Sequence, residues 1–162
     1  DLELIRYWRN KDFVRNQMLT KDLISSENQN KWFLKMDKSI NHIFIYSLDN
    51  IDVGCVNCKI SDSKKGIFDI GVYCGNSEYF GNPVNLLSII FIHDYAFNTL
   101  KLNLSITSIK KDNKSSIGIN KKIGYEFYDH LNKEFDLYSL NNSKYISSKN
   151  QLKKIISYFA KL

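Results

Sequence analysis

The residues best suited to chemistry lie where a predicted strand at 66–74 ends in a loop that leads into a predicted apolar helix at 84–100. The loop holds Gly81 close to the helix start, and Pro83 precedes the helix at a position where a first turn tolerates proline. A helix N-terminus presents unpaired N–H groups and the positive end of a dipole, which together bind phosphate. The segment therefore predicts a phosphate-binding turn, although a surface loop before a core helix explains it equally well.

Metal and redox sites are not indicated. Cys55 and Cys58 have CxxC spacing, but a zinc site needs a second pair of ligands, and His42, His93 and His130 are scattered along the chain. A redox CxxC needs a helix N-terminus, whereas these cysteines lie in a strand-like run. We interpret them as small buried thiols in a reducing cytoplasm, and His93, inside the apolar helix, as a packed side chain.

Composition narrows the class of protein. The chain has 162 residues and is 43% hydrophobic, which is enough for one domain with a real core. No apolar run reaches the roughly 18 residues that cross a bilayer, and no secretion signal precedes the first helix. The net charge of +6 favours a polyanionic ligand such as nucleic acid, a nucleotide-sugar or CoA. Because no dense basic block appears, nucleic acid is the least favoured of these.

Hydrophobic periodicity predicts the order of the elements. Helices are expected at 1–10 and from Ser25 or Ser26 to 36, followed by an antiparallel meander of strands at 42–48, 52–61 and 66–74. The long helix at 84–100 comes next, then a strand at 102–109, a helix at 115–123 ended by Gly124, and strands at 127–128 and 133–140. The last element is an amphipathic helix at 147–162, with Leu152, Ile155, Ile156, Phe159 and Leu162 on one face. This order predicts an α/β fold with a mixed sheet between helices.

Two motifs resemble one known family. The pattern Asn113…Ser116-Ile117…Lys122-Ile123-Gly124-Tyr125 resembles the signature N-x-x-[AS]-[IL]-x-[LF]-[YN]-x-K-x-G-[FY] of the GNAT superfamily of N-acetyltransferases. Near the start, Trp8-Arg9-Asn10, Val14-Arg15 and Met18 resemble the W-R-N…V-R-x-x-M opening of two GNAT branches. One branch acetylates protein N-termini, including those of ribosomal proteins, and the other acetylates nucleotide-linked amino-deoxysugars. The Ile24-Ser25 helix start, the 73–83 loop and the tail 133–136 favour the sugar branch, in particular the amino-sugar N-acetyltransferases of pseudaminic acid biosynthesis.

This resemblance, which spans about Leu2 to Leu140, implies the GNAT fold. That fold is a mixed, mostly antiparallel sheet splayed in the middle, with helices on both faces and a first strand that would precede Asp1. The acetyltransferase domain would cover 1–140, and 141–162 would be a C-terminal amphipathic extension of the same domain, which could also pair two copies in a homodimer. The implied protein is a cytoplasmic, acetyl-CoA-dependent enzyme that acetylates a small-molecule amine, with no metal, no nucleic-acid partner and no membrane span.

The resemblance also implies site residues. Acetyl-CoA would lie between the strand that ends at Tyr73 and the strand that ends near Ile109. Its contacts would come from Val72, Tyr73 and Cys74 along the pantetheine arm, from Tyr79, Phe80, Gly81, Asn82, Pro83, Val84 and Asn85 around the pyrophosphate, and from Asn113, Ser116, Asn120 and Lys121, with Lys114 near the phosphates. Tyr73, Ser108 and Asn120 are the candidate catalytic residues. Arg9, Asn10 and His42 are the candidate acceptor-binding residues, and Arg9 could fork onto a nucleotide phosphate.

Two departures from the family pattern bear on activity. The loop reads Pro83-Val84-Asn85 where the family has G-x-G or G-x-A, and proline has no N–H to offer a phosphate. Asn120 stands where many members carry the tyrosine that protonates the departing thiolate, and an asparagine cannot supply a proton. No side chain is a convincing general base, since Ser108 could hold a water but not act alone, and Asp69 and Tyr73 are as well explained structurally. A protein N-terminal acetyltransferase and a degenerate GNAT that binds CoA without turnover therefore remain as alternatives.

Overall fold

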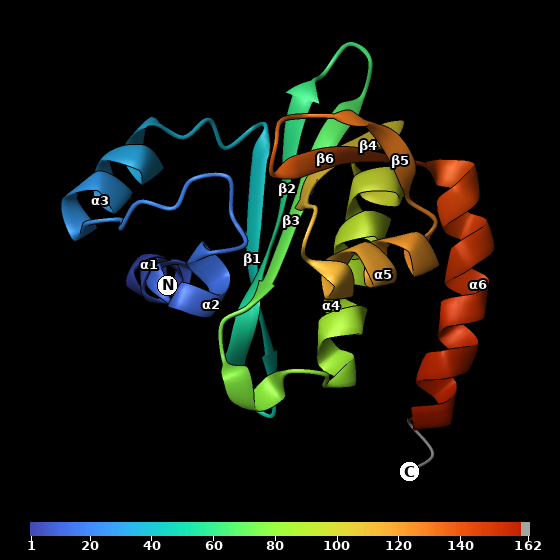
Figure 1. The fold of residues 1–162 in the computed structure, drawn as a ribbon, viewed down its shortest axis with the longest axis horizontal. Coiled ribbons are helices and arrows are strands. Elements are labelled where there is room, and N and C mark those ends of the chain that lie inside the picture. Colours follow the sequence, from blue (N-terminus) through green and yellow to red (C-terminus); the bar gives the residue numbers. More distant parts are fainter. Residues whose placement is uncertain (160–162) are drawn as a thin grey trace. The chain divides into compact units, whose positions relative to one another are not determined.

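The chain folds around a six-stranded sheet whose hydrogen-bonded order is β1-β2-β3-β4-β6-β5 (Figure 1). The computed structural model describes residues 1–159, with side chains through Leu152. The strands are β1 (Asn41–Leu48), β2 (Ile51–Asp62), β3 (Ile67–Cys74), β4 (Leu104–Lys110), β5 (Glu126–His130) and β6 (Phe135–Asn141). The helices are α1 (Leu2–Asn10), α2 (Asp12–Arg15), α3 (Ser26–Lys35), α4 (Pro83–Asp94), α5 (Lys114–Ile123) and α6 (Asn142–Phe159), with short helical turns at Ser77–Tyr79 (η1) and Tyr95–Thr99 (η2).

The predicted fold class is confirmed. The pairs β1–β2, β4–β6 and β5–β6 are antiparallel, and β3 pairs with β4 in parallel over two residue pairs, Ile67↔Leu104 and Phe68↔Ser105. The chain divides into two compact units, one of residues 1–59 and 71–92 and the other of 60–70 and 93 onward. No helix among the described residues is long and apolar enough to cross a membrane.

In the first unit, the β1–β2 hairpin separates two environments. Its two-residue turn places Asp49 and Asn50 at φ 51° and 64°, a left-handed pair that suits the twist of a hairpin and that these residue types tolerate. Side chains alternate along the strands, so Ile43 faces one side of the sheet and Phe44 the other. Phe44 packs edge-on against Phe91 of α4 at 5.3 Å, whereas Ile43 faces a cavity shared with α1 and α3.

A helix cap positions α3, and a close contact between a tryptophan and a glycine positions α1. Ser25 caps α3 as predicted, because its hydroxyl accepts a hydrogen bond from the Asn28 N–H at 3.1 Å. Trp8 of α1 is 3% exposed and packs onto the backbone of Gly75, where a β-carbon would lie 2.2 Å from the indole ring. Glycine is therefore needed at position 75 for this contact. The four-residue helix α2, which hydrophobic periodicity did not predict, follows directly after α1.

The second unit is built on β4 and β6, which pair over seven residues. Its core is aromatic: the His93 ring stacks on Tyr145 of α6 at 5.2 Å, and Phe97 packs edge-on against Phe68 at 5.2 Å. The interpretation of His93 as a packed side chain is confirmed, since it is 1% exposed and its Nε2 is hydrogen-bonded to the Tyr125 hydroxyl at 3.0 Å. Cys55 and Cys58, in the first unit, are buried and form no disulfide among the described residues, in agreement with their interpretation as small buried thiols.

Two helix boundaries differ from the prediction, and a third agrees with it. The helix predicted as continuous over 84–100 ends at Asp94 and continues as a wider π-type turn, in which the Leu100 N–H bonds the Tyr95 carbonyl at 2.9 Å. The last helix begins at Asn142, five residues before the prediction, because the Asn141 side chain accepts the Lys144 N–H at 3.0 Å and caps it. Gly124 ends α5 at φ 107°, as predicted. The expected apolar face beyond Leu152 (Ile155, Ile156, Phe159 and Leu162) lies outside the described side chains.

Candidate functional site

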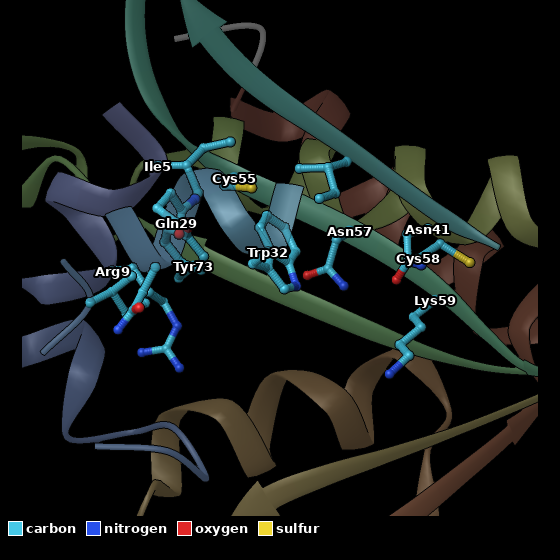
Figure 2. A pocket seen from close by; sticks show the side chains of 13 residues that line it. Ile5, Arg9, Gln29, Trp32, Asn41, Cys55, Asn57, Cys58, Lys59 and Tyr73 are labelled. Atoms are coloured by element: carbon cyan, nitrogen blue, oxygen red, sulfur yellow. The ribbon is translucent and has the colours of Figure 1, made fainter. Parts of the chain in front are cut away.

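The first unit contains a cavity of about 450 Å³ between α1, α3 and the outer three strands (Figure 2). Helix α1 supplies Ile5 and Arg9, and α3 supplies Asn28, Gln29 and Trp32. The strands supply Asn41 and Ile43 from β1, Cys55, Asn57, Cys58 and Lys59 from β2, and Tyr73 from the end of β3, while Ile24 contributes from the loop before α3. The cavity is large enough for a small organic ligand.

Arg9 brings an unused donor into this cavity. Its Nη2 donates to the Thr20 carbonyl at 3.3 Å, and its Nη1 is buried with no hydrogen-bond partner among the described residues. Burial lowers the pKa of the guanidinium, and the neighbouring Tyr73 opposes that effect. A guanidinium remains charged in proteins, so Nη1 is a charged donor that the described protein groups leave unsatisfied.

Tyr73, which also lines the cavity, has a second unsatisfied polar atom. Its hydroxyl is buried, and no group in the described part of the chain lies in ordinary hydrogen-bond geometry to it. Burial raises the pKa of Tyr73 well above its usual range, and the adjacent Cys55 thiol raises it further, while Arg9 acts in the opposite direction. The hydroxyl therefore keeps its proton at neutral pH and serves as a donor.

The charges around the cavity have one sign. Arg9 and Lys59 are its cationic side chains, and Asn28, Gln29, Asn41 and Asn57 add amides that can both donate and accept. No aspartate, glutamate or histidine is among the described residues that line it. In Figure 2 the two cations lie toward opposite ends of the group, with the Trp32 indole between them. Such a lining favours a ligand that is anionic and rich in hydroxyl groups.

Of the three predicted acceptor-binding residues, only Arg9 lines the cavity. Asn10 instead holds the loop, because its Nδ2 donates to the Ile24 carbonyl at 2.8 Å and its Oδ1 accepts the Ile24 N–H at 2.9 Å. It therefore positions Ile24, which does line the cavity. His42 alternates with Asn41 and Ile43, so it faces the other side of β1. The structure does not bring His42 together with Arg9.

The predicted phosphate-binding turn has open space beside Gly81, but two of its backbone N–H groups are hydrogen-bonded to other groups of the turn. Gly81 lies at φ 77° with open space where a β-carbon would be. Asn82 caps α4, since its Oδ1 accepts the Val84 N–H at 2.9 Å and its carbonyl accepts the Asn85 N–H at 3.1 Å. Pro83 has no N–H. The turn therefore leaves space beside Gly81, and the Asn82 side chain already takes the Val84 N–H.

The flanking residues of this turn are held by side-chain contacts. Asn85 Oδ1 accepts the Tyr46 hydroxyl at 2.6 Å, and Asn85 Nδ2 donates to the Tyr79 carbonyl at 2.6 Å. Phe80 is 56% exposed and packs edge-on against Phe13 at 5.2 Å. These contacts fix the loop that joins β3 to α4.

The end of β3 is anchored through its backbone. The N–H groups of residues 75 and 76 both donate to the Val53 carbonyl, at 2.8 and 3.0 Å. The Cys74 thiol contacts the carbonyl of residue 76 at 3.0 Å, and Lys11 donates to the carbonyl of residue 75 at 3.0 Å. The segment Val72–Cys74, predicted to contact pantetheine, is thus a firmly held strand end, and its Tyr73 also lines the cavity.

The remaining predicted site residues belong to the second unit. Asn113 caps α5 by accepting the Ser116 N–H at 3.0 Å. Asn120 donates to the Ser116 carbonyl at 2.9 Å and to its hydroxyl at 3.3 Å, so its amide is turned onto its own helix. Lys121 is exposed on the same helix, and Lys114 donates to the Lys111 carbonyl at 3.3 Å. Ser108 lies opposite Leu137 on the half-buried face of β4.

The sequence did not single out several residues that line the cavity. Trp32, for example, lines the cavity and is 45% exposed. Asn57 and Lys59 share a face of β2 with Cys55, and Asn41 pairs with Lys59 across the hairpin. Strand alternation together with the hairpin turn could have placed these three polar side chains on one face.

No family model matches the chain, and no curated protein does. Solved structures match over nearly its whole length. One is a spermidine N-acetyltransferase from Vibrio cholerae in complex with CoA and spermine, at TM-score 0.81 and 15% identity over 90% of this chain and 92% of that one. Another is the apo form of FdhC, a nucleotide-linked sugar GNAT, at 0.77 and 21% over 94% and 88%. A third is an aminoglycoside acetyltransferase in complex with coenzyme A, at 0.77 and 12% over 92% and 94%. The chain therefore has the fold of the GNAT acetyltransferases.

Proposed function

We propose that this protein is an acetyl-CoA-dependent N-acetyltransferase of a small-molecule amine. Acetyltransferases share its fold, and two of the matching structures contain CoA. The turn before α4 offers the open position at Gly81 for the CoA phosphates, and Val72, Tyr73 and Cys74 offer the strand end for pantetheine. The chemistry that acetyl-CoA supplies is an acyl group activated as a thioester. Such an enzyme would work in the cytoplasm, where acetyl-CoA is available.

The acceptor we propose is an amino sugar linked to a nucleotide. The observation that carries this choice is the lining of the cavity, which combines Arg9 and Lys59 with four amides and contains no carboxylate among the described residues. Polyamines and aminoglycosides are polycations, and a cavity with two cations and no carboxylate disfavours them. A nucleotide diphosphate carries negative charge, and its sugar offers hydroxyl groups to the amides.

We assign roles within this proposal. The Arg9 guanidinium would hold a phosphate or ring oxygen of the acceptor with the Nη1 donor that the protein leaves unused. Tyr73 would donate from its buried hydroxyl and orient the sugar next to the strand end. Asn113, Ser116, Asn120 and Lys121 would contact CoA, and Ser108 would hold a water. The acetyltransferase domain would comprise 1–140, with 141–162 as its helical extension.

Three observations favour a second candidate, a GNAT that binds CoA without turnover. Asn82 already occupies the Val84 N–H, Pro83 lacks a donor, and Asn120 bonds to its own helix. Each of these weakens a contact that the fold normally offers to the acetyl donor. The proposed acceptor site does not depend on any of them.

The experiment that tests the proposal measures release of free CoA thiol from acetyl-CoA. The acceptor panel is UDP- and dTDP-linked amino sugars, spermidine, an aminoglycoside and peptides with a free N-terminus. We expect release with nucleotide-linked amino sugars alone. Release with peptides alone would assign the protein N-terminal reaction instead, and release with spermidine would refute the acceptor class. If no acceptor in the panel causes thiol release but calorimetry shows that CoA still binds, the result would favour the non-catalytic candidate.

A further inference from the structure

We propose that the cavity in the first unit binds the acceptor amine only in its neutral form, and that this selection takes the place of a side-chain base. The inference rests on the proposed function, because it concerns the amine that the acetyl group would be transferred to. A protonated amine cannot attack a carbonyl, so an N-acetyltransferase must remove one proton before or during the reaction. Among the described residues that line the cavity there is no aspartate, glutamate or histidine to accept that proton.

The charged and titratable groups that face the cavity come from three elements. Arg9 comes from α1, Cys55, Cys58 and Lys59 come from β2, and Tyr73 comes from β3. Helix α3, strand β1 and the loop residue Ile24 contribute only amide and apolar side chains. An ammonium group would therefore meet two cations and no anion within the described lining.

The carboxylates nearest along α1 and α3 are engaged elsewhere. Glu3 accepts hydrogen bonds from Arg6 and from the Ser26 hydroxyl, each at 2.8 Å, and it points to solvent. Glu27 is paired with Lys31 at 2.6 Å on the exposed side of α3. Neither residue lines the cavity, so neither can neutralise a cationic ligand group there.

The remaining groups cannot act as the base. Burial raises the pKa of the Cys55 thiol to about 11, so it is protonated at neutral pH. Burial likewise raises the pKa of Tyr73, which stays a donor. Asp69 lies on the same face of β3 as Tyr73 by alternation, but it is not among the residues that line the cavity.

The electrostatic consequence is a lowered pKa for any amine bound there. Like charges and desolvation both disfavour the ammonium form, and for the amine to bind only when neutral they must together lower its pKa by about three units. In the step itself an N–H bond of the ammonium breaks, its electron pair stays on nitrogen, and the proton passes to water. The amine then enters the cavity with its lone pair free. Tyr73 and the amides can orient the neutral group without taking its proton.

The test is calorimetry on the full chain without acetyl-CoA, in buffers of low and high ionisation enthalpy. The probe is UDP-glucosamine, which carries a free amine, and the matched control is UDP-glucose. At a pH one unit below the pKa of the free amine, about 0.9 proton should be released for each UDP-glucosamine bound. UDP-glucose should bind without releasing a proton from the ligand, because it has no amine. Arg9→Gln should lose part of the release, and spermidine should not bind at millimolar concentration.

Three results would overturn the inference: binding of UDP-glucosamine without proton release, binding of spermidine, or failure of UDP-glucosamine to bind. The readout does not depend on turnover, so the two proposals can fail separately. Proton-coupled binding without thiol release would retain this inference and refute the acetyltransferase activity. Thiol release from acetyl-CoA with an amino sugar that binds in its ammonium form would support the acetyltransferase activity and refute the selection of the neutral amine.

Discussion

Replacing Arg9 tests the acceptor site most directly, because its two terminal nitrogens differ in what they contact. Nη2 holds the loop through the Thr20 carbonyl at 3.3 Å, and Nη1 is buried and unused. Arg9→Met keeps much of the apolar stem and removes every donor. Arg9→Lys keeps the charge but presents a single ammonium, which cannot serve the loop and a ligand in the same way.

The magnitude follows from the contact that is lost. A hydrogen bond from a charged donor contributes about 1.5–3 kcal/mol, and the buried Nη1 would make one such bond to the acceptor. Arg9→Met should therefore raise the KM for the acceptor by about 10- to 150-fold, with a smaller change in kcat. Arg9→Lys should fall between the wild type and Arg9→Met. The KM for acetyl-CoA should stay within about 2-fold, since Arg9 lies outside the predicted CoA contacts.

Arg15→Met is the matched control. Arg15 also supports the loop, through the Lys21 carbonyl at 3.5 Å, and it is paired with Asp12 at 2.5 Å, but it does not line the cavity. Thiol-release kinetics on all three variants, with urea unfolding to compare their stability, separate ligand binding from loop support. An acceptor KM that rises equally in Arg9→Met and Arg15→Met would refute the role of Arg9.

Two other predictions use single contacts. Tyr125→Phe should destabilise the protein by about 2 kcal/mol or more, because the hydroxyl joins the buried His93 and Ser105 at 3.0 and 2.6 Å, and losing hydrogen bonds inside a core costs about 1–3 kcal/mol per group. Urea unfolding measures this, and the exposed Tyr128→Phe should change stability by less than about 0.5 kcal/mol. Pro83→Ala adds an N–H at the first position of α4, so calorimetry should find CoA bound about 3- to 10-fold more tightly, corresponding to a bond of roughly 0.5–1.5 kcal/mol. An unchanged Kd would mean that the CoA phosphates do not reach this turn.

Most of the fold could be predicted because local signals and periodicity agree. Alternation placed the strands to within about two residues, and the turn at Asp49, the cap at Ser25 and the stop at Gly124 are all present. The prediction failed for a helix that is too short to show a period and for a helix start that is set by a single capping side chain. Helix α2 spans four residues, too few for a helical period to show. Helix α6 starts early because Asn141, the last residue of β6, also caps it.

The candidate site could be predicted only in part, because its polar residues are ordinary in sequence. Lys59 and Asn57 belong to no recognisable motif. Their place in the cavity depends on the face of β2 that they share and on the helices that cover that face. The capping role of Asn82 had a signal in the Asn-Pro pair, since asparagine favours the position before a helix and proline the first turn. Its consequence for phosphate binding follows only from the hydrogen bond itself.

The electrostatics of the cavity bear on the choice between the two proposed acceptor classes. A cavity that carries Arg9 and Lys59 has two positive charges to neutralise, and a nucleotide diphosphate supplies two negative charges where a peptide N-terminus supplies none. A nucleotide-linked acceptor therefore supplies the negative charge that this site lacks. A peptide N-terminus does not supply it, and this difference is the physical reason to prefer the sugar nucleotide.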